Sequence, residues 1–229
     1  MSNYKISVII PTVLKSTRVL LKLVSILLRD NSVSEIIIIE NSGRGLYIPS
    51  NEKIKIYSPK ENLYVNASWN LGVSLAENER LLIINDDILC CENFCSKVLA
   101  SGILEKPNTG LVGLSISCIK QFKREEVTDI EPPPITNENL LEFKPLNRYI
   151  SLGDWGSAFF CKKSNYHNIP DDLKIIFGDN YLLKRNFDLG KINYQITGLN
   201  FNHIHSLSSA SNEFSRIISS DIRNSKKYL

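Results

Sequence analysis

Runs of β-branched and aliphatic residues recur along the first half of the chain, separated by helical patterns or turns. The apolar runs predict strands at residues 5–10, 35–39, 54–57, 81–84 and 109–116. Apolar residues at helical spacing predict helices at residues 17–29, 66–76 and 91–101. Strands that alternate with helices form mainly parallel sheets covered by helices, so we expect an α/β fold.

The second half of the chain departs from this alternation. Residues 120–147 are rich in charge and include the run Pro132, Pro133 and Pro134, a composition that predicts a long loop or a lid. Further strands are expected at residues 157–161, 192–196 and 199–204, and a helix is expected after Phe177. The length of 229 residues suits one domain.

Polar side chains stand at the carboxyl ends of three predicted strands. Thr12 follows the first strand, residues 40–42 follow the second, and residues 85–87 follow the fourth. Because such ends meet at one edge of a parallel sheet, we expect these clusters to form one site. Adjacent Asp86 and Asp87 are unlike packing residues, because buried carboxylates need partners. Paired acids suit a hard divalent cation and hence a diphosphate, which points to an enzyme that uses an activated nucleotide.

Composition narrows the class of protein without identifying a substrate. Hydrophobic residues make up 43% and charged residues 22% of the chain, and the net charge of +3 gives no indication of nucleic-acid binding. Five cysteines without a repeating spacing predict reduced thiols rather than disulfides or a zinc site. With neither a secretion signal nor an uncharged apolar run of about 18 residues, we expect a cytoplasmic protein.

The end of the chain is basic, with Arg216, Arg223, Lys226 and Lys227 close together. A solvated helix face accounts for this pattern, and so does contact with an anionic membrane surface. The second interpretation would make the protein peripheral to the inner face of a membrane.

Several segments, in order, resemble the GT-A-fold glycosyltransferases of family 2, which build bacterial and viral surface glycans. They are SVIIPT (7–12), IIIIENSG (36–43), ENLYVNASWNLGV (61–73), IINDDIL (83–89), and the pair GDWGSAFF (153–160) and IFGDNYLLKR (176–185). Near the end, HIHSLSS (203–209) is similar to a His-x-x-Ser-x-Ser element of the family. The order and spacing of the segments together carry the resemblance.

The resemblance implies one GT-A domain that transfers a sugar with inversion. Residues 1–118 would form the nucleotide-binding half, 119–148 a loop or lid, 149–209 the acceptor and catalytic half, and 210–229 a basic helix or tail. The donor would be a UDP- or dTDP-sugar, and the cofactor would be Mn2+ or Mg2+. The acceptor would be a glycan or a lipid-linked saccharide in surface polysaccharide synthesis.

The same resemblance implies roles for individual residues. Asp179 would be the catalytic base, Asp87 and His203 would hold the metal, and Asp154 and Trp155 would bind the acceptor. The nucleotide-sugar would be bound by Pro11, Thr12, Glu40, Asn41, Ser42, Asn62, Asn70 and Asp86.

Simpler roles stay open for several of these residues. Asp179 could cap a helix, and Asn62 and Asn70 could cap turns or helices. Trp155 could lie in the core. His203 and His205 would point the same way on a strand, so either could be the ligand.

The sequence also departs from the family motifs. Asn85 replaces the first acid of the Asp-x-Asp motif, Glu40 replaces an aspartate, and most glycines of the third segment are absent. Two alternatives therefore stay open: a sugar-phosphate nucleotidyltransferase, and a GT-A-like binding module without catalysis. The nucleotidyltransferase would need a glycine-rich loop after the first strand, and residues 11–15 contain no glycine.

Overall fold

The computed structural model describes residues 4–123, 129–134, 141–146, 155–205 and 212–229. Its helices are α1 (Thr17–Arg29), α2 (Tyr64–Leu75), α3 (Phe94–Ala100), α4 (Gly178–Asp188) and α5 (Asn212–Ser225). Its strands are β1 (Ile6–Thr12), β2 (Val33–Glu40), β3 (Ile54–Tyr57), β4 (Arg80–Ile84), β5 (Ile88–Leu89), β6 (Thr109–Leu114), β7 (Ile119–Lys123), β8 (Glu142–Leu146), β9 (Ala158–Lys162), β10 (Ile192–Thr197) and β11 (Phe201–His205). The expected alternation of strands and helices in the first half is confirmed.

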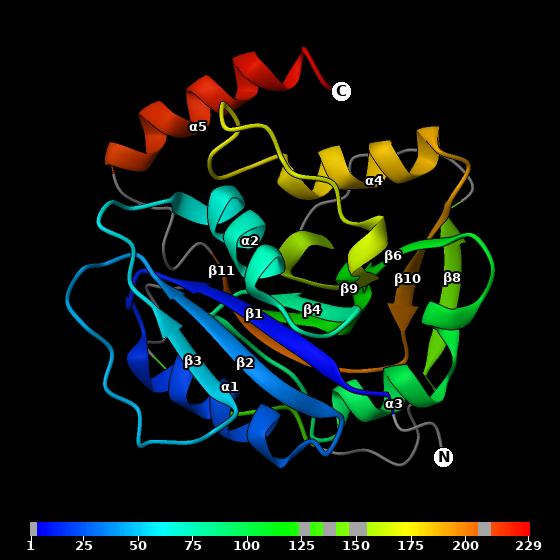
Figure 1. The fold of residues 1–229 in the computed structure, drawn as a ribbon, viewed down its shortest axis with the longest axis horizontal. Helices are drawn as coiled ribbons and strands as arrows, with labels where there is room; N and C mark the ends of the chain where they lie inside the picture. The colour runs from blue at the N-terminus through cyan, green and yellow to red at the C-terminus, as the bar shows by residue number, and fades with distance from the viewer. Residues whose placement is uncertain (1–3, 124–128, 135–140, 147–154, 206–211) are drawn as a thin grey trace.

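Eight strands form one twisted sheet in the order β3-β2-β1-β4-β9-β6-β10-β8 (Figure 1). The pairs β1–β2, β1–β4, β2–β3 and β6–β10 are parallel. Of these eight strands, β9, between β4 and β6, and β8, at the edge, run the other way. The sheet is therefore mainly parallel, as the sequence predicts, and its parallel strands end at a common edge.

Helices cover both faces of this sheet. Figure 1 shows α2, α4 and α5 on one side and α1 and α3 on the other. Successive residues of a strand point to opposite faces, so the alternation along β1 divides the core in two. Ile10 packs with α1, while Ile9 packs with Trp69 and Val73 of α2. Gly72 allows this close approach of α2, because a Cβ there would overlap the side chain of Ile9.

A second, three-stranded sheet has the order β5-β11-β7. β11 runs antiparallel to β5, with His203 opposite Ile88, and parallel to β7. The backbone N–H of Ile204 also donates to the carbonyl of Asp87 at 3.0 Å. This pairing brings a strand from the end of the chain against the residues that follow β4.

The expectation of a long loop at residues 120–147 is wrong for the parts that the structure describes, which include two strands, while the expectation of a lid stays a prediction. β7 pairs with β11, and β8 adds an antiparallel edge strand beside β10. Pro145 is tolerated in β8 because an edge strand leaves one row of backbone groups unpaired. Between these strands, Ile130 is buried and Asp129 accepts from Lys22 of α1 at 3.0 Å, so this stretch is fastened to the core.

The helix expected at residues 91–101 is shorter than predicted. β5 follows β4 closely, and Asn93 takes a left-handed backbone conformation (φ 56°), so α3 begins only at Phe94. All five cysteines are buried free thiols, in agreement with the prediction of reduced cysteines.

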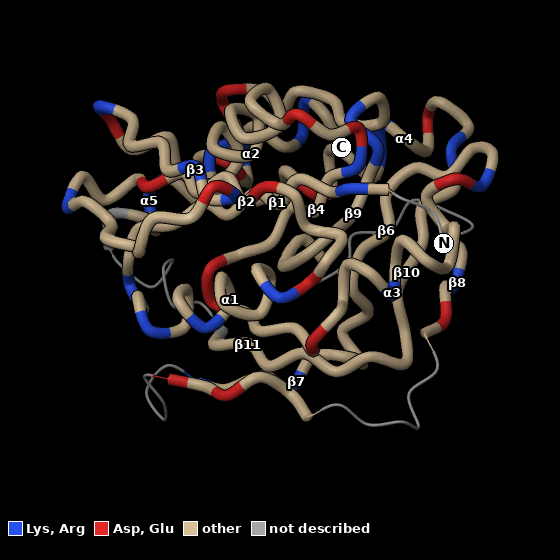
Figure 2. Tube along the Cα trace, turned by 60° about the horizontal axis from the view of Figure 1, so that its bottom comes forward, with Lys and Arg blue, Asp and Glu red and all other residues tan. Residues whose placement is uncertain are grey.

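Charge is spread over the molecule rather than gathered on one face. Figure 2 shows basic and acidic positions interspersed along the described chain. Within the described ranges, no helix has both the length and the apolar character needed to cross a membrane.

Glu35 of β2 is a buried carboxylate, only 3% exposed, that ties three segments together. It accepts hydrogen bonds from the hydroxyl of Ser7, from the backbone N–H of Glu77 at 2.6 Å and from the ammonium of Lys55 at 2.9 Å. Burial by itself raises the pKa of Glu35, but these hydrogen bonds and the charge of Lys55 outweigh it and lower the pKa overall. The ionised form is therefore the one that the fold stabilises.

Replacing Glu35 with glutamine should lower the free energy of unfolding near pH 7 by about 2 kcal/mol, because buried donors lose a charged acceptor. The pKa is lower in the folded than in the unfolded state, where it is about 4.3. The stability from Glu35 is therefore present above the unfolded pKa and lost as the pH falls through the folded pKa. As the pH falls through this acidic range, the free energy of unfolding measured with urea should decrease less for Glu35→Gln than for the unchanged protein. Equal decreases would contradict this role of Glu35.

Candidate functional site

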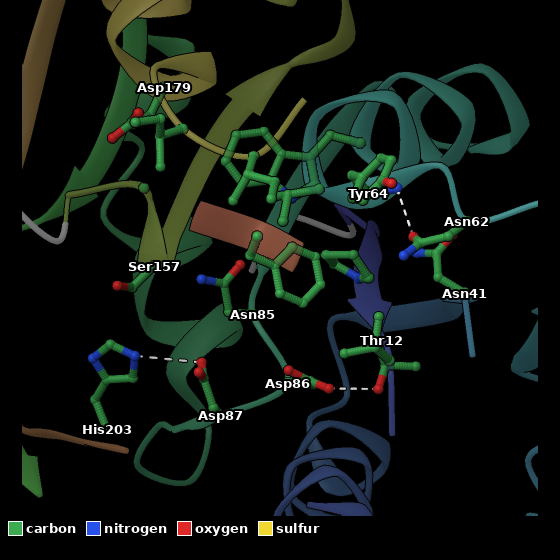
Figure 3. Close-up of a pocket in the computed structure, with 18 residues that line it drawn as sticks. Thr12, Asn41, Asn62, Tyr64, Asn85, Asp86, Asp87, Ser157, Asp179 and His203 are labelled. Carbon is green, nitrogen blue, oxygen red and sulfur yellow. Dashed lines mark hydrogen bonds and ion pairs between the residues drawn. The ribbon is translucent and has the colours of Figure 1, made fainter. Parts of the chain in front are cut away.

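A cavity of about 280 Å³ opens at the edge of the large sheet where β1, β2 and β4 end (Figure 3). Residues from both halves of the chain meet around it. They are Pro11, Thr12, Val13, Asn41, Asn62, Tyr64, Val65, Trp69, Asn85, Asp86, Asp87, Gly156, Ser157, Ile175, Ile176, Asp179, His203 and Phe214. The convergence of three strand ends at one pocket, expected from the sequence, is therefore present.

The loop after β1 is held to the end of β4 through one hydroxyl. Thr12 donates to a carboxylate oxygen of Asp86, and its own oxygen accepts from the backbone N–H of Leu14 at 2.9 Å. The carbonyl of Thr12 accepts from the backbone N–H of Asn41 at 2.8 Å. Leu14 has a positive φ of 54°, which is uncommon for a leucine. These contacts give the floor of the pocket a defined shape.

Asp86 and Asp87 are both buried, and their side chains point in different directions (Figure 3). Burial raises the pKa of Asp86, the adjacent charge of Asp87 raises it further, and the hydroxyl of Thr12 lowers it in part. Two carboxylates this close are more stable together when a cation lies nearby.

Asp87 faces His203, which β11 delivers from the other end of the chain. Its Oδ1 lies 3.3 Å from Nε2 of His203, and this oxygen is buried and accepts no hydrogen bond from the described residues. A carboxylate oxygen and an imidazole nitrogen arranged in this way suit a shared divalent cation. Among the residues that the structure describes, no group of three or more His, Cys, Asp or Glu side chains could hold a metal ion. The remaining ligands would have to come from a bound diphosphate or from water. The side chain of His205, the other candidate, lies outside the described part.

Asp179 enters the pocket from the first turn of α4. The residue before this helix, Phe177, is in the left-handed conformation (φ 66°), so the chain turns sharply into the helix. The carboxylate packs against Gly156: a Cβ at that glycine would lie 2.7 Å from Oδ2 of Asp179. Next to Gly156, the carbonyl of Ser157 accepts from the backbone N–H of Asn85 at 2.9 Å, which joins the start of β9 to the end of β4.

The start of α2 forms another wall, held by two asparagines. Oδ1 of Asn41 accepts from the backbone N–H of Leu63 at 3.0 Å, and its Nδ2 donates to Ser68 at 2.8 Å. Oδ1 of Asn62 accepts from the backbone N–H of Tyr64 at 2.8 Å, where the backbone has a positive φ of 59°. The prediction that Asn62 could cap a turn is confirmed, and both asparagines also line the pocket.

The remaining wall comes from apolar residues that were not among the predicted site residues. Ile175 and Ile176 precede α4, and Phe214 lies in the first turn of α5, where its ring contacts Tyr64 edge-on at 6.1 Å between centroids. With Val65 and Trp69 of α2, these residues make one side of the pocket apolar. The basic helix or tail expected at residues 210–229 is a helix, α5, but nothing in the sequence ties it to the strand ends.

Asp221 of α5 positions this wall. It is fully buried, and its carboxylate accepts from the backbone N–H groups of Lys174, Ile175 and Ile176 at 3.0, 2.7 and 3.0 Å. On the opposite side of the same loop, the amide of Asn66 donates to the carbonyls of Leu173 and Ile176. The loop before α4 is thus fastened to α2 and to α5.

Replacing Asp221 with asparagine should destabilise the fold by about 2–4 kcal/mol, because the amide cannot accept from three N–H groups at once. Chemical denaturation would measure the change. Asp172→Asn is a matched control on the same loop: Asp172 pairs with exposed Lys227 at 2.7 Å, and such surface pairs contribute about 1 kcal/mol or less. Equal effects of the two substitutions would contradict the anchoring role of Asp221.

Three predicted nucleotide-binding residues do not line the pocket. Glu40 is fully buried, and its carboxylate accepts from the backbone N–H groups of Ser42 at 2.6 Å and Gly45 at 3.3 Å. Burial raises the pKa of Glu40, but these hydrogen bonds outweigh it, so the pKa is lowered overall. Glu40 and Ser42 therefore shape the turn after β2. Asn70 is directed to the backbone and side chain of the 166–169 segment, with Oδ1 accepting from Tyr166 at 2.8 Å and from Ile169 at 3.0 Å.

The two predicted acceptor contacts have different outcomes. Trp155 is fully buried, lies stacked on Phe159 at 5.5 Å between centroids, and would clash with a side chain at Gly113. This burial contradicts the expectation that its ring faces an acceptor. Asp154 lies outside the described residues, so its role stays a prediction. His167 is half-buried, and burial, together with the charge of Arg185, lowers its pKa.

Comparisons with known proteins agree with this architecture. No family model matches the chain, and no curated protein matches it. Among solved structures, the chain is similar to GalNAc-T7 with UDP, GalNAc and Mn2+, at a TM-score of 0.62 and 12% identity over 94% of this chain and 48% of that chain. It is also similar to S. aureus TarS 1–349 (TM-score 0.57, 12% identity, 98% of this chain and 72% of that chain). The complex of TarS 1–349 with UDP gives a TM-score of 0.57 and 15% identity over 96% and 66% of the two chains. This chain spans about half the length of the GalNAc-T7 chain, and the likeness shows that it has a GT-A-like fold.

Proposed function

We propose that this protein is an inverting glycosyltransferase that moves a sugar from a UDP- or dTDP-linked donor to a glycan or lipid-linked acceptor in surface polysaccharide synthesis. The observation that carries the proposal is the meeting of Asp86, Asp87 and Asp179 in one pocket at the carboxyl edge of the sheet. Two of these acids follow β4 and the third begins α4, so the fold alone brings them together. Paired acids for a cation and a separate carboxylate for a proton are what this reaction needs.

Asp87 and His203 would hold the cation, Mn2+ or Mg2+. Their positions fit, because a buried carboxylate oxygen and an imidazole nitrogen lie 3.3 Å apart at the pocket. The eighteen described residues around the cavity include no lysine or arginine, so this described lining offers little to neutralise a diphosphate. Bound there, the cation supplies the charge that offsets the departing nucleoside diphosphate.

Asp179 would accept the proton of the acceptor hydroxyl. Its place in the first turn of α4 favours the carboxylate form, because the helix dipole is positive at that end. Figure 3 shows Asp179 across the pocket from the Asp87–His203 pair, with Asn85 and Ser157 between them. A donor sugar bound between the diphosphate and Asp179 would be open to attack on the face opposite the leaving group.

Thr12, Asn41 and Asn62 would contact the nucleoside, and Asp86 would contact the ribose or the donor sugar. Thr12, Asn41 and Asn62 all line the pocket where β1, β2 and α2 meet. This is the crevice that ligands of open α/β sheets occupy. Solved structures that share the fold contain UDP, and one also contains Mn2+, which supports the same ligands here.

A cytoplasmic location at the inner face of a membrane would suit a lipid-linked acceptor. The end of α5 and the residues after it present exposed Arg223, Lys226 and Lys227. Basic residues grouped in this way attract anionic lipid headgroups. Sedimentation with anionic and neutral vesicles tests this part of the proposal independently of catalysis.

A binding module without catalysis is the second candidate. Asn85 occupies the place of an acid, and no metal-binding group of three or more acidic, histidine or cysteine side chains occurs within the described ranges. Two measurements test both candidates. One is calorimetry of UDP and dTDP binding, with Mn2+ and then with excess chelator, and the other is hydrolysis of the sugar-nucleotide donor. We expect binding that depends on Mn2+ and slow hydrolysis of the matching sugar nucleotide. Binding without hydrolysis or transfer would favour the module, and no binding of either nucleotide would reject the proposed function.

A further inference from the structure

The chain enters α4 through a turn that the local sequence disfavours. Phe177 adopts a left-handed backbone conformation with a φ of 66°, a region that bulky residues rarely occupy. Such a conformation persists only where the surrounding structure holds it in place. Asp179 follows two residues later, in the first turn of α4, so the contacts that fix this turn also fix the position of its carboxylate.

Asn66 of α2 contacts the residues on both sides of Phe177. Its Nδ2 donates to the carbonyl of Leu173 at 3.0 Å and to the carbonyl of Ile176, the residue before Phe177, at 3.3 Å. Its Oδ1 packs against Gly178, the residue after Phe177, where an added Cβ would overlap that oxygen. The absence of a side chain at Gly178 therefore lets the first residue of α4 lie directly against Asn66.

Backbone hydrogen bonds reinforce this contact. The N–H groups of Val65 and Asn66 donate to the carbonyl of Lys174 at 3.1 and 3.0 Å. Both groups belong to the first turn of α2, where a helix offers no acceptor of its own to them. Asn66 is only 1% exposed, so a carbonyl that lost its amide would be left buried without a donor.

From this geometry we infer that Asn66 is a positioning residue for Asp179. It holds the turn at Phe177 so that the first turn of α4 presents the carboxylate to the pocket. The inference rests on the proposed function, in which Asp179 accepts a proton, and it adds a residue that is not among the described lining of the pocket. A turn released from Asn66 would carry the carboxylate away from the reacting hydroxyl, and small displacements of this kind reduce turnover strongly.

Amide hydrogen exchange tests the contact without any substrate. Asn66→Ala should speed exchange in residues 176–182 by about five- to tenfold, because the turn loses the side chain that holds it. Asn224→Ala is the matched control: Nδ2 of Asn224 donates to the carbonyl of Asp172 at 2.8 Å, earlier in the same loop. The control should leave exchange in residues 176–182 unchanged. Exchange at the same rate in Asn66→Ala as in the unchanged protein would overturn the inference.

Turnover separates the positioning of a base from a general loss of structure. The reaction measured is hydrolysis of UDP- and dTDP-sugars with Mn2+, in which water replaces the acceptor hydroxyl. Asn66→Ala should lower its rate by about 10- to 10²-fold and change nucleotide affinity by less than about twofold. In an Asp179→Asn background the same substitution should lower the residual rate little further, because both residues act through one carboxylate.

Equal losses of rate in the two backgrounds, or a parallel loss of nucleotide affinity, would overturn the assignment of Asn66. Asn66→Ser, a milder change that keeps a hydroxyl donor, should give the same effects in smaller measure if Asn66→Ala does not fold. The proposed function fails by a different result, namely that the unchanged protein neither binds nor hydrolyses these sugar nucleotides. In that case the exchange experiment still decides whether Asn66 fixes the turn that carries Asp179.

Discussion

Replacing Asp179 with asparagine should lower kcat by about 10²- to 10⁴-fold and leave nucleotide binding almost unchanged. The amide has nearly the shape of the carboxylate but cannot accept the proton of the acceptor hydroxyl. Asp179 stands in the first turn of α4, across the pocket from Asp87 and His203, so the metal and nucleotide contacts should persist. Initial rates of sugar transfer, together with calorimetry of UDP and Mn2+ binding, would measure the two effects separately.

Asp188→Asn is the matched control, because Asp188 ends the same helix and pairs with Lys184 at the surface, at 2.8 Å. Gly156→Ala is a companion variant that keeps the carboxylate of Asp179 but displaces it, since the added Cβ would lie 2.7 Å from Oδ2 of Asp179. A displaced base should lower kcat by about 10²-fold. If Asp179→Asn retained near-normal turnover, Asp179 would be a helix-stabilising residue and the proposed mechanism would be wrong.

Replacing Asp87 with asparagine should weaken Mn2+ binding in the presence of UDP by about 10²-fold or more, because an anionic ligand is lost. The adjacent substitution Asp86→Asn should change Mn2+ affinity far less, because Asp86 points to Thr12 and Asp87 points to His203. Calorimetric or paramagnetic titration with Mn2+ would compare the two variants. Transfer activity should follow the same order when it is measured against Mn2+ concentration.

Equal Mn2+ affinities of the two variants would contradict the assignment of Asp87 as a ligand. His203→Asn provides the complementary measurement, because β11 holds the imidazole against Asp87 through the pairing of His203 with Ile88. We expect it to reduce Mn2+ affinity in the presence of UDP.

Local sequence patterns predict the elements of the first half with good accuracy. The helix expected at residues 17–29 is α1, with the same bounds, and the side chain of Ser16 accepts from the backbone N–H of Val19 at its start. The strand expected at residues 54–57 is β3. These elements are specified by their own apolar periodicity and capping residues, which act within a few residues along the chain.

The direction of side chains near the end of a strand is predicted less well. Glu40 and Asn41 are neighbours at the end of β2, yet Glu40 turns into its own loop while Asn41 lines the pocket. Trp155, expected to face the acceptor, lies in the core against Phe159. At the ends of strands and in the turns beside them the regular alternation stops, so sequence position no longer decides which way a side chain points.

The amino-acid sequence alone specifies the mainly parallel sheet and the edge at which Thr12, Asp86 and Asp87 gather, because strand periodicity and the position of polar residues after strands are local properties. Tertiary contacts decide the rest of the pocket: Phe214 closes it, and Asp221 holds its wall in place. Those two residues lie in α5, far along the chain from the strands they serve. Their contacts depend on how helices dock against the sheet, which is a balance of packing and buried hydrogen bonds that no local pattern encodes.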